Sequence, residues 1–231
     1  MRQSKADREM SDEVRRSVAA ACRALAADGL VLGTAGNVSA RVGDALAITA
    51  TGARFESMTD AQVTIVGLDG EVLDGEFEPT SELELHLGIY RNFGAGSVVH
   101  THATTCVAVS CVVDELPCVH YQMLTLGGSV RVAPYATFGS PGLAAAVVEA
   151  LQGKSAALLA NHGAVTYGAD LAAAVESSKL LEWAATIYWR ARSMGEVRAL
   201  DQAAQTAVVQ AAVEKKYGTT QPLSDIETAG A

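Results

Sequence analysis

The chain of 231 residues has no apolar run of about 18 residues, the length that a membrane-spanning helix requires. Residues 1–10 are polar and carry charges of both signs, unlike a secretory signal peptide. The four cysteines show no Cys-x-x-Cys spacing; they are Cys22, Cys106, Cys111 and Cys118. We therefore expect a cytoplasmic protein whose thiols are reduced.

Positive charge is also scarce. Lysine and arginine number 17 against 26 acidic residues, for a net charge of -9. This balance argues against nucleic acid or an anionic membrane as a partner. It leaves room for a small anionic substrate, because backbone amides can bind a phosphate without any net positive charge.

Hydrophobic residues make up 49% of the chain, enough for a large core. Apolar strand-like runs alternate with helical patterns, which predicts an α/β fold. Residues 11–28 are expected to form a helix that Ser11 caps and Gly29 ends. We expect another helix to run from Asp170 to about Met194, capped by Asp170, and a further one over 201–217.

The sequence Val98-Val99-His100-Thr101-His102 is the most informative stretch, because the chain has only five histidines. The valines predict a strand, and residues two apart on a strand share one face. His100 and His102 can therefore chelate one metal ion. The alternative is a surface strand that carries two histidines with no ligand.

A third histidine follows another apolar run, in Leu158-Leu159-Ala160-Asn161-His162-Gly163. Strand ends are where α/β folds place their sites. Three histidines and one glutamate, Glu82, make a zinc-type ligand set. A thiolate ligand is the less favoured alternative, and Cys106 is the cysteine nearest to the histidine strand.

Glu82 stands where a helix is predicted to begin, in Pro79-Thr80-Ser81-Glu82-Leu83-Glu84. Ser81 and Glu84 have the spacing of a capping box, which leaves Glu82 free for another role. His86 lies four residues after Glu82 and shares its helix face. We favour a packing role for His86 over a metal-binding pair with Glu82.

Two segments combine glycine with small hydroxyl or amide residues: Gly33-Thr34-Ala35-Gly36-Asn37-Val38-Ser39 and Thr49-Ala50-Thr51-Gly52. Such loops turn sharply and expose N–H groups, which suits a phosphate. Either loop could also be a plain turn, and neither is a Walker or dinucleotide-binding motif.

Taken in order, these motifs resemble the superfamily of class II sugar-phosphate aldolases and ribulose-phosphate 4-epimerases, and most of all the L-fuculose-1-phosphate aldolases. The similarity extends from about Cys22 to Tyr217. Besides the segments above it includes His120-Tyr121 and the stretch from Tyr135 to Gly139.

The resemblance implies a role for each matched residue. The implied metal ligands are His100, His102, His162 and Glu82, and Glu82 is also the implied catalytic acid/base. The implied phosphate-binding residues are Thr34, Gly36, Asn37, Thr51, Gly52 and Ser81. Tyr121 resembles a catalytic tyrosine that reaches into a neighbouring subunit's site, Tyr217 one that closes over the substrate, and Phe138 an aromatic residue near the aldehyde.

The implied reaction is the reversible cleavage of a ketose 1-phosphate to dihydroxyacetone phosphate and an aldehyde, through an enediolate, with one zinc ion per chain. Fuculose, rhamnose-type, 5-deoxyribulose and methylthioribulose phosphates all remain possible substrates. An epimerase is less favoured, because its family places an aspartate close to the position of His120-Tyr121. A dehydratase or decarboxylase on the same site stays open. The head domain of adducin, a non-catalytic relative, lacks the ligand set.

The resemblance also implies a three-layer α/β/α sandwich with a central mixed, largely antiparallel sheet. We expect a single domain over residues 1–217, a polar tail over 218–231, and a homotetramer with sites at subunit interfaces.

Overall fold

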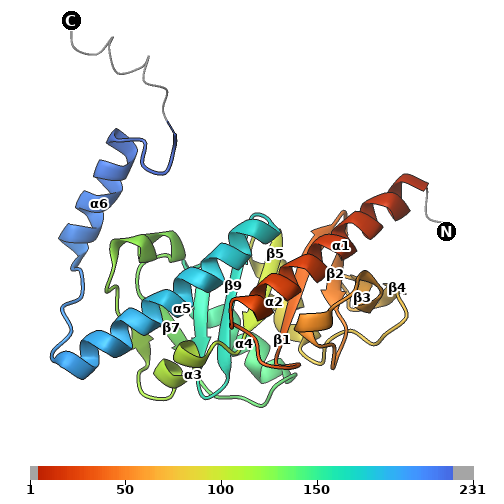
Figure 1. Ribbon diagram of the computed structural model, residues 1–231, viewed down its shortest axis with the longest axis horizontal. Coiled ribbons are helices and arrows are strands. Elements are labelled where there is room, and N and C mark those ends of the chain that lie inside the picture. Colours follow the sequence, from red (N-terminus) through yellow and green to blue (C-terminus); the bar gives the residue numbers. More distant parts are fainter. Residues whose placement is uncertain (1–4, 221–231) are drawn as a thin grey trace, which may run out of the picture.

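One large sheet runs through the protein, shown in Figure 1 as a computed structural model that describes residues 5–220. Its nine strands follow the order β4-β3-β2-β1-β5-β9-β8-β7-β6. Along the chain they are β1 (Gly36–Val42), β2 (Ala45–Thr49), β3 (Val63–Gly67), β4 (Val72–Asp74), β5 (Ser97–Thr101), β6 (Glu115–Leu116), β7 (Val130–Ala133), β8 (Ala156–Leu159) and β9 (Gly163–Gly168). Strands β7 and β8 are parallel, and the other neighbouring pairs are antiparallel.

Helices cover both faces of this sheet. The α-helices are α1 (Lys5–Ala27), α2 (Leu83–Asn92), α3 (Thr104–Ser110), α4 (Pro141–Ala150), α5 (Leu171–Met194) and α6 (Gln202–Glu214), and the short 3-10 helices are η1 (Phe55–Ser57), η2 (Asp60–Gln62) and η3 (Tyr121–Leu126). Helices α1, α3 and α5 pack on one face, and α2 and α4 on the other. The predicted α/β/α sandwich with a mixed, largely antiparallel sheet is thus confirmed.

Each face of the sheet has its own hydrophobic core. On β5, Val99 packs in the core under α1 and α5, whereas Val98 packs in the core under α2 and α4. Alternation along the strand then places His100 on the same face as Val98. The face of β5 that carries His100 is therefore the one covered by α2, the helix that begins next to Glu82.

Several predicted helix boundaries hold. Asp170 caps α5 by accepting a hydrogen bond from Ala173 N at 2.8 Å, and Gly29 follows α1 with a φ of 73°. The predicted start of the first helix at Ser11 is wrong, because α1 already begins at Lys5. No glycine or proline interrupts residues 5–10, so the helix extends through Ser11.

The predicted capping box at Ser81 and Glu84 is also wrong. Glu82 itself is the residue that precedes α2, and its backbone N–H donates to Thr80 Oγ1 at 3.3 Å. Glu84 instead faces Arg91 at 3.5 Å. The first glycine-rich segment is only partly a loop, since Gly36 already begins β1.

Helix α6 lies apart from the sheet and approaches η3 (Figure 1). Within residues 5–220, no helix combines the length and the apolar character needed to cross a membrane. Most of the predicted polar tail, residues 221–231, lies outside the described part of the chain.

Candidate active site

The sheet brings the three predicted histidine ligands together. His100 lies in β5, and His102 follows the strand directly. Strand β9 pairs antiparallel with β5, with Ala164 opposite Thr101. The turn that precedes β9 carries His162, so this side chain arrives beside the end of β5.

Glu82 approaches from the other side of β1. The segment before it runs beside the end of β2, where Pro79 bridges to Ala50 and Thr80 N donates to Thr49 O at 2.9 Å. Asn37 on β1 is the cross-strand partner of His100. Directly opposed side chains on neighbouring strands share one face, which places Asn37 between the histidines and α2.

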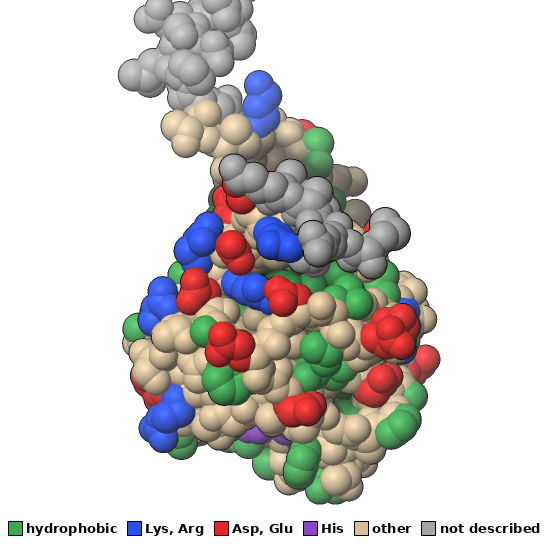
Figure 2. All heavy atoms as spheres, turned by 90° about the vertical axis from the view of Figure 1, so that its right-hand side faces the viewer, with side chains coloured by type: hydrophobic (Ala, Val, Ile, Leu, Met, Phe, Trp, Pro, Cys, Tyr) green, Lys and Arg blue, Asp and Glu red, His purple; other side chains and the backbone are tan. Residues whose placement is uncertain are grey.

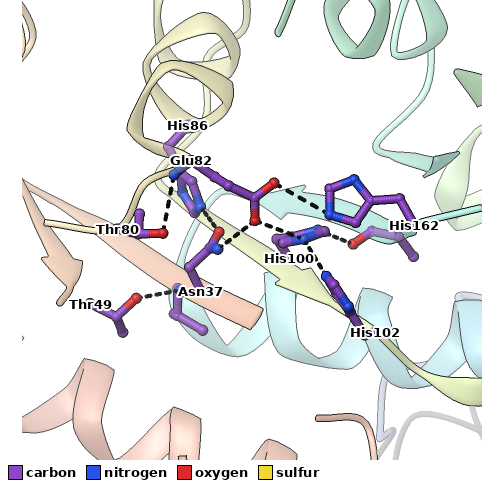
Figure 3. Close-up of polar contacts among 10 residues, drawn as sticks. Asn37, Thr49, Thr80, Glu82, His86, His100, His102 and His162 are labelled. Carbon is purple, nitrogen blue, oxygen red and sulfur yellow. Dashed lines mark hydrogen bonds and ion pairs between the residues drawn. The ribbon is translucent and has the colours of Figure 1, made fainter. Parts of the chain in front are cut away.

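Four ligand atoms converge at this point, as Figure 3 shows. His100 Nε2 lies 3.1 Å from Glu82 Oε2 and 3.0 Å from His102 Nε2. His162 Nε2 lies 3.4 Å from Glu82 Oε1. Each of the four residues offers one atom to a group in which all atoms lie within 4.8 Å of one another.

The arrangement of donors and acceptors among these atoms favours a bound cation. His100 Nδ1 lies 2.9 Å from the carbonyl oxygen of Ala164, which can only accept, so Nδ1 carries the proton. In neutral His100 the Nε2 lone pair then points at the Glu82 carboxylate. Glu82 Oε1 is buried without a hydrogen-bond partner. Lone pairs that face one another in this way fit a divalent ion bound between them, with zinc-type ligands.

The electrostatics keep these groups in the forms that bind a metal. Burial by itself raises the pKa of the Glu82 carboxyl group, but the contact with His100, which is attractive when that ring is protonated, and the hydrogen bond from Asn37 outweigh burial and hold that pKa well below its usual range. Burial and the neighbouring imidazoles lower the pKa of His102 to about 4, and burial lowers the pKa of His162. At neutral pH the carboxylate is therefore ionised and these two imidazoles are neutral.

A cavity of about 450 Å³ opens on this cluster. All six residues predicted to hold phosphate line it; they are Thr34, Gly36, Asn37, Thr51, Gly52 and Ser81. Gly36 is closely packed, since a Cβ there would lie 3.0 Å from His100 O. Gly52 has a φ of 71°, which favours glycine.

The cavity carries little charge of its own. Glu82 is its only acidic residue, and no lysine or arginine of the described chain lines it. An anion bound there would meet backbone N–H groups, hydroxyl groups and a bound cation. Charged side chains of both signs are scattered over the face shown in Figure 2, where only a small area of histidine reaches the surface.

Three residues that were considered from the sequence as site residues lie outside this cluster and its cavity. Tyr121 and Tyr217 do not line this cavity; their hydroxyl groups lie 3.0 Å from each other near α6. Cys106 is buried and is not part of the cluster, and burial raises the pKa of its thiol well above the usual value. The alternative of a thiolate ligand is therefore not supported.

Two residues that line the cavity, Asn161 and Tyr135, had no role predicted from the sequence. Asn161 precedes His162 with a φ of 56°, a conformation that asparagine tolerates better than most residues. Tyr135 lines the same cavity as Phe138. The only signal for either was its place within a quoted motif.

Comparison with known proteins identifies the family of this chain. Residues 16–189 match the family described as "Class II Aldolase and Adducin N-terminal domain". A 5-deoxy-D-ribulose 1-phosphate aldolase from Bacillus thuringiensis is 36% identical over 191 residues, covering 81% of this chain and 90% of the relative. An L-fuculose phosphate aldolase from Escherichia coli K12 is 35% identical over 179 residues, covering 77% and 83% of the two chains.

A solved structure of an L-fuculose 1-phosphate aldolase superposes with a TM-score of 0.83 at 31% identity, over 89% of this chain and 97% of that one. The family match covers more than half of the chain, and both the sequence relatives and the fold agree with it. The resemblance inferred from the motifs is thus confirmed, and the chain belongs to the class II aldolase family.

Proposed function

We propose that the protein is a zinc-dependent aldolase that reversibly cleaves a ketose 1-phosphate to dihydroxyacetone phosphate and an aldehyde. The observation that carries the proposal is the position of the ligand cluster. Three imidazoles and the Glu82 carboxylate converge beside a cavity, and the six residues predicted to bind phosphate line the same cavity. The relatives named above are aldolases of sugar phosphates.

In this proposal the chain itself orients the substrate. The loops at Gly36, Thr51 and Gly52 and the Ser81 hydroxyl hold the phosphate, so binding energy at this end places the C3–C4 bond over the metal ligands. The imidazoles of His100, His102 and His162 hold the zinc. When bound, the ion supplies Lewis-acid stabilisation of the negative charge left on the substrate when that bond breaks.

Glu82 has the second role of acid/base. Its carboxylate is ionised and buried, and one of its oxygens has no hydrogen-bond partner. A carboxylate that turns from the metal toward a substrate bound beside it can accept a proton from that substrate and return it.

The predicted roles of Tyr121 and Tyr217 fit only if they serve another subunit. Both are exposed and lie outside the cavity of their own chain, and the hydrogen bond to Tyr217 raises the pKa of Tyr121. The exposed Val209 and Val213 on α6, which line one pocket with both tyrosines, support a subunit contact in this region. We propose a homotetramer in which each pair of tyrosines reaches a neighbouring site.

The four cysteines are free thiols, three of them buried. This state is compatible with the reducing environment of the cytoplasm, where we propose that the enzyme works.

A coupled assay for release of dihydroxyacetone phosphate tests the proposal. The panel contains the 1-phosphates of fuculose, rhamnulose, 5-deoxyribulose and 5-methylthioribulose, each with zinc-loaded and chelator-treated protein. We expect zinc-dependent release from at least one of them. No release from any, with one zinc bound per chain, would reject the aldolase and leave an epimerase, dehydratase or decarboxylase on the same site.

A further inference from the structure

A continuous chain of polar side chains lies behind Glu82. Asn37 Nδ2 donates to Glu82 Oε2 at 2.9 Å, and Asn37 Oδ1 lies 2.5 Å from His86 Nε2. Ser39 Oγ is 2.6 Å from His86 Nδ1 and 3.0 Å from Tyr90 Oη. The near part of this chain, from Glu82 through Asn37 to His86, is visible in Figure 3.

The fold shields this chain from solvent. Asn37 and Ser39 point to one face of β1, and His86 and Tyr90 lie one turn apart on α2. His86 and Ser39 are completely buried, and Asn37 and Tyr90 are at most 5% exposed. Groups buried to this extent depend on one another for hydrogen bonds, because water does not replace a lost partner.

The direction of every hydrogen bond follows from Glu82. An ionised carboxylate can only accept, so the amide nitrogen of Asn37 must face it and Oδ1 must face His86. His86 Nε2 therefore carries a proton. Burial lowers the pKa of His86 to about 3, so the ring is neutral and its Nδ1 has no proton.

The hydroxyl groups of Ser39 and Tyr90 donate in the same direction along the chain of hydrogen bonds. His86 Nδ1 must accept, so Ser39 Oγ donates to it. Ser39 Oγ is then free to accept the hydrogen of the Tyr90 hydroxyl group. All four donors thus point along the chain toward Glu82, and one tautomer of His86 satisfies every group.

We infer that His86 is a positioning residue, which holds the Asn37 amide in the single orientation that donates to Glu82 Oε2 and so directs Glu82 Oε1 toward the histidine cluster. The inference rests on the proposed role of Glu82 as a metal ligand and acid/base. It assigns to His86 a specific task beyond packing.

The fate of Asn37 Oδ1 shows why this task matters. The Glu82 carboxylate still favours the amide nitrogen, but without the N–H group of His86 the Asn37 oxygen is left buried and unpaired. The Asn37 side chain then gains by turning toward another donor, and Glu82 Oε2 loses the hydrogen bond that fixes the carboxylate beside His100 and His162.

Three variants test the inference. His86→Leu removes the donor to Asn37, whereas His86→Gln keeps an N–H group at a similar distance from the backbone. Ser178→Ala is the matched control, since it breaks a buried hydroxyl pair with Thr166 (2.6 Å) on the opposite face of the sheet.

The first readout is zinc affinity, measured by competition with a chromophoric chelator. Loss of a group that orients a metal ligand typically weakens binding by about 10- to 100-fold. We expect a loss of that size in His86→Leu, its recovery in His86→Gln, and wild-type affinity in Ser178→Ala. Equal affinity in His86→Leu and Ser178→Ala would overturn the inference.

The second readout is the tautomer of His86 in metal-free wild-type protein, from the two-bond ¹⁵N couplings of labelled histidine. We expect a proton on Nε2 and none on Nδ1, and the opposite pattern would reject the proposed direction of the chain. This measurement decides the question even if His86→Leu does not fold. Both readouts are independent of the substrate panel, so a failed aldolase assay leaves them interpretable.

Discussion

A Cβ atom on Gly163 would overlap the carbonyl oxygen of Thr101, and it would lie 3.1 Å from His102 Cδ2 and 3.2 Å from His100 Cε1. The turn between β8 and β9 thus approaches the end of β5 so closely that only glycine fits. This contact sets the distance between His162 and the other two histidines.

We predict that Gly163→Ala weakens zinc binding by at least about tenfold, because the added methyl group forces β9 and the histidine rings apart. Gly94→Ala is the control, since a Cβ there meets no atom within 4 Å. Zinc titration of both variants measures the difference. Wild-type affinity in Gly163→Ala would show that the turn can shift without disturbing the ligands.

His102→Ala is expected to lose both the bound zinc and the activity, because it removes one of three neutral ligands from a site that has no spare donor among its described neighbours. His120→Ala serves as the control, since His120 packs against Trp183 and Tyr121 outside the cluster. Metal analysis of the purified variants gives the zinc content per chain. One zinc per chain in His102→Ala would contradict the assigned ligand set.

Glu82→Gln should retain much of the zinc but lose turnover by about 100- to 10,000-fold, the usual contribution of an acid/base group. The amide keeps an oxygen that can face the metal, but it does not accept a proton. Glu84→Gln, which alters an exposed glutamate two residues away, should leave turnover near the wild-type value. A fully active Glu82→Gln enzyme would refute the acid/base role.

The metal-free protein should become less stable as the pH falls below about 6.5. The pKa of His86 is about 3 in the folded protein and 6.5 in the unfolded chain, so the unfolded state binds more protons between these values. Acidification in this window therefore favours unfolding, by about 1.4 kcal/mol per pH unit for each such group. The lowered pKa of His102 acts in the same direction down to about 4.

Urea unfolding between pH 7 and pH 5 measures this dependence. His86→Gln removes one of the titrating groups. The free energy of unfolding of the variant should therefore fall less steeply as the pH is lowered, with a slope that corresponds to about one proton fewer taken up on unfolding. An identical slope in the variant would mean that His86 does not have a lowered pKa.

Glu182→Gln should destabilise the fold by about 1–3 kcal/mol, because the carboxylate accepts from two backbone N–H groups at the start of α3. These bonds join Thr105 N to Oε1 at 2.9 Å and Cys106 N to Oε2 at 2.8 Å. Glu176→Gln on the same helix is the control, since Glu176 pairs only with Lys179 at the surface. Thermal unfolding compares the two, and equal melting temperatures would contradict the role of Glu182.

Features that depend on neighbours in the sequence were predicted well. The spacing of His100 and His102 indicated one face of a strand, and Asp170 was identified as a helix cap, because both depend on local backbone geometry. The same local reasoning failed at Ser81. There the segment pairs with the end of β2, and the residue that precedes α2 is Glu82 rather than Ser81, with its N–H group bonded to Thr80 Oγ1.

The composition, the order of the motifs and the identity of the candidate metal ligands were determined by the sequence by itself. Only the tertiary structure decided how they meet. The order of strands β1, β5 and β9 places Asn37, His100 and His162 side by side although they are far apart in the chain. That placement also bonds Asn37 to Glu82 and His86, which no local pattern could indicate, because the direction of a hydrogen bond depends on the partner that the fold supplies.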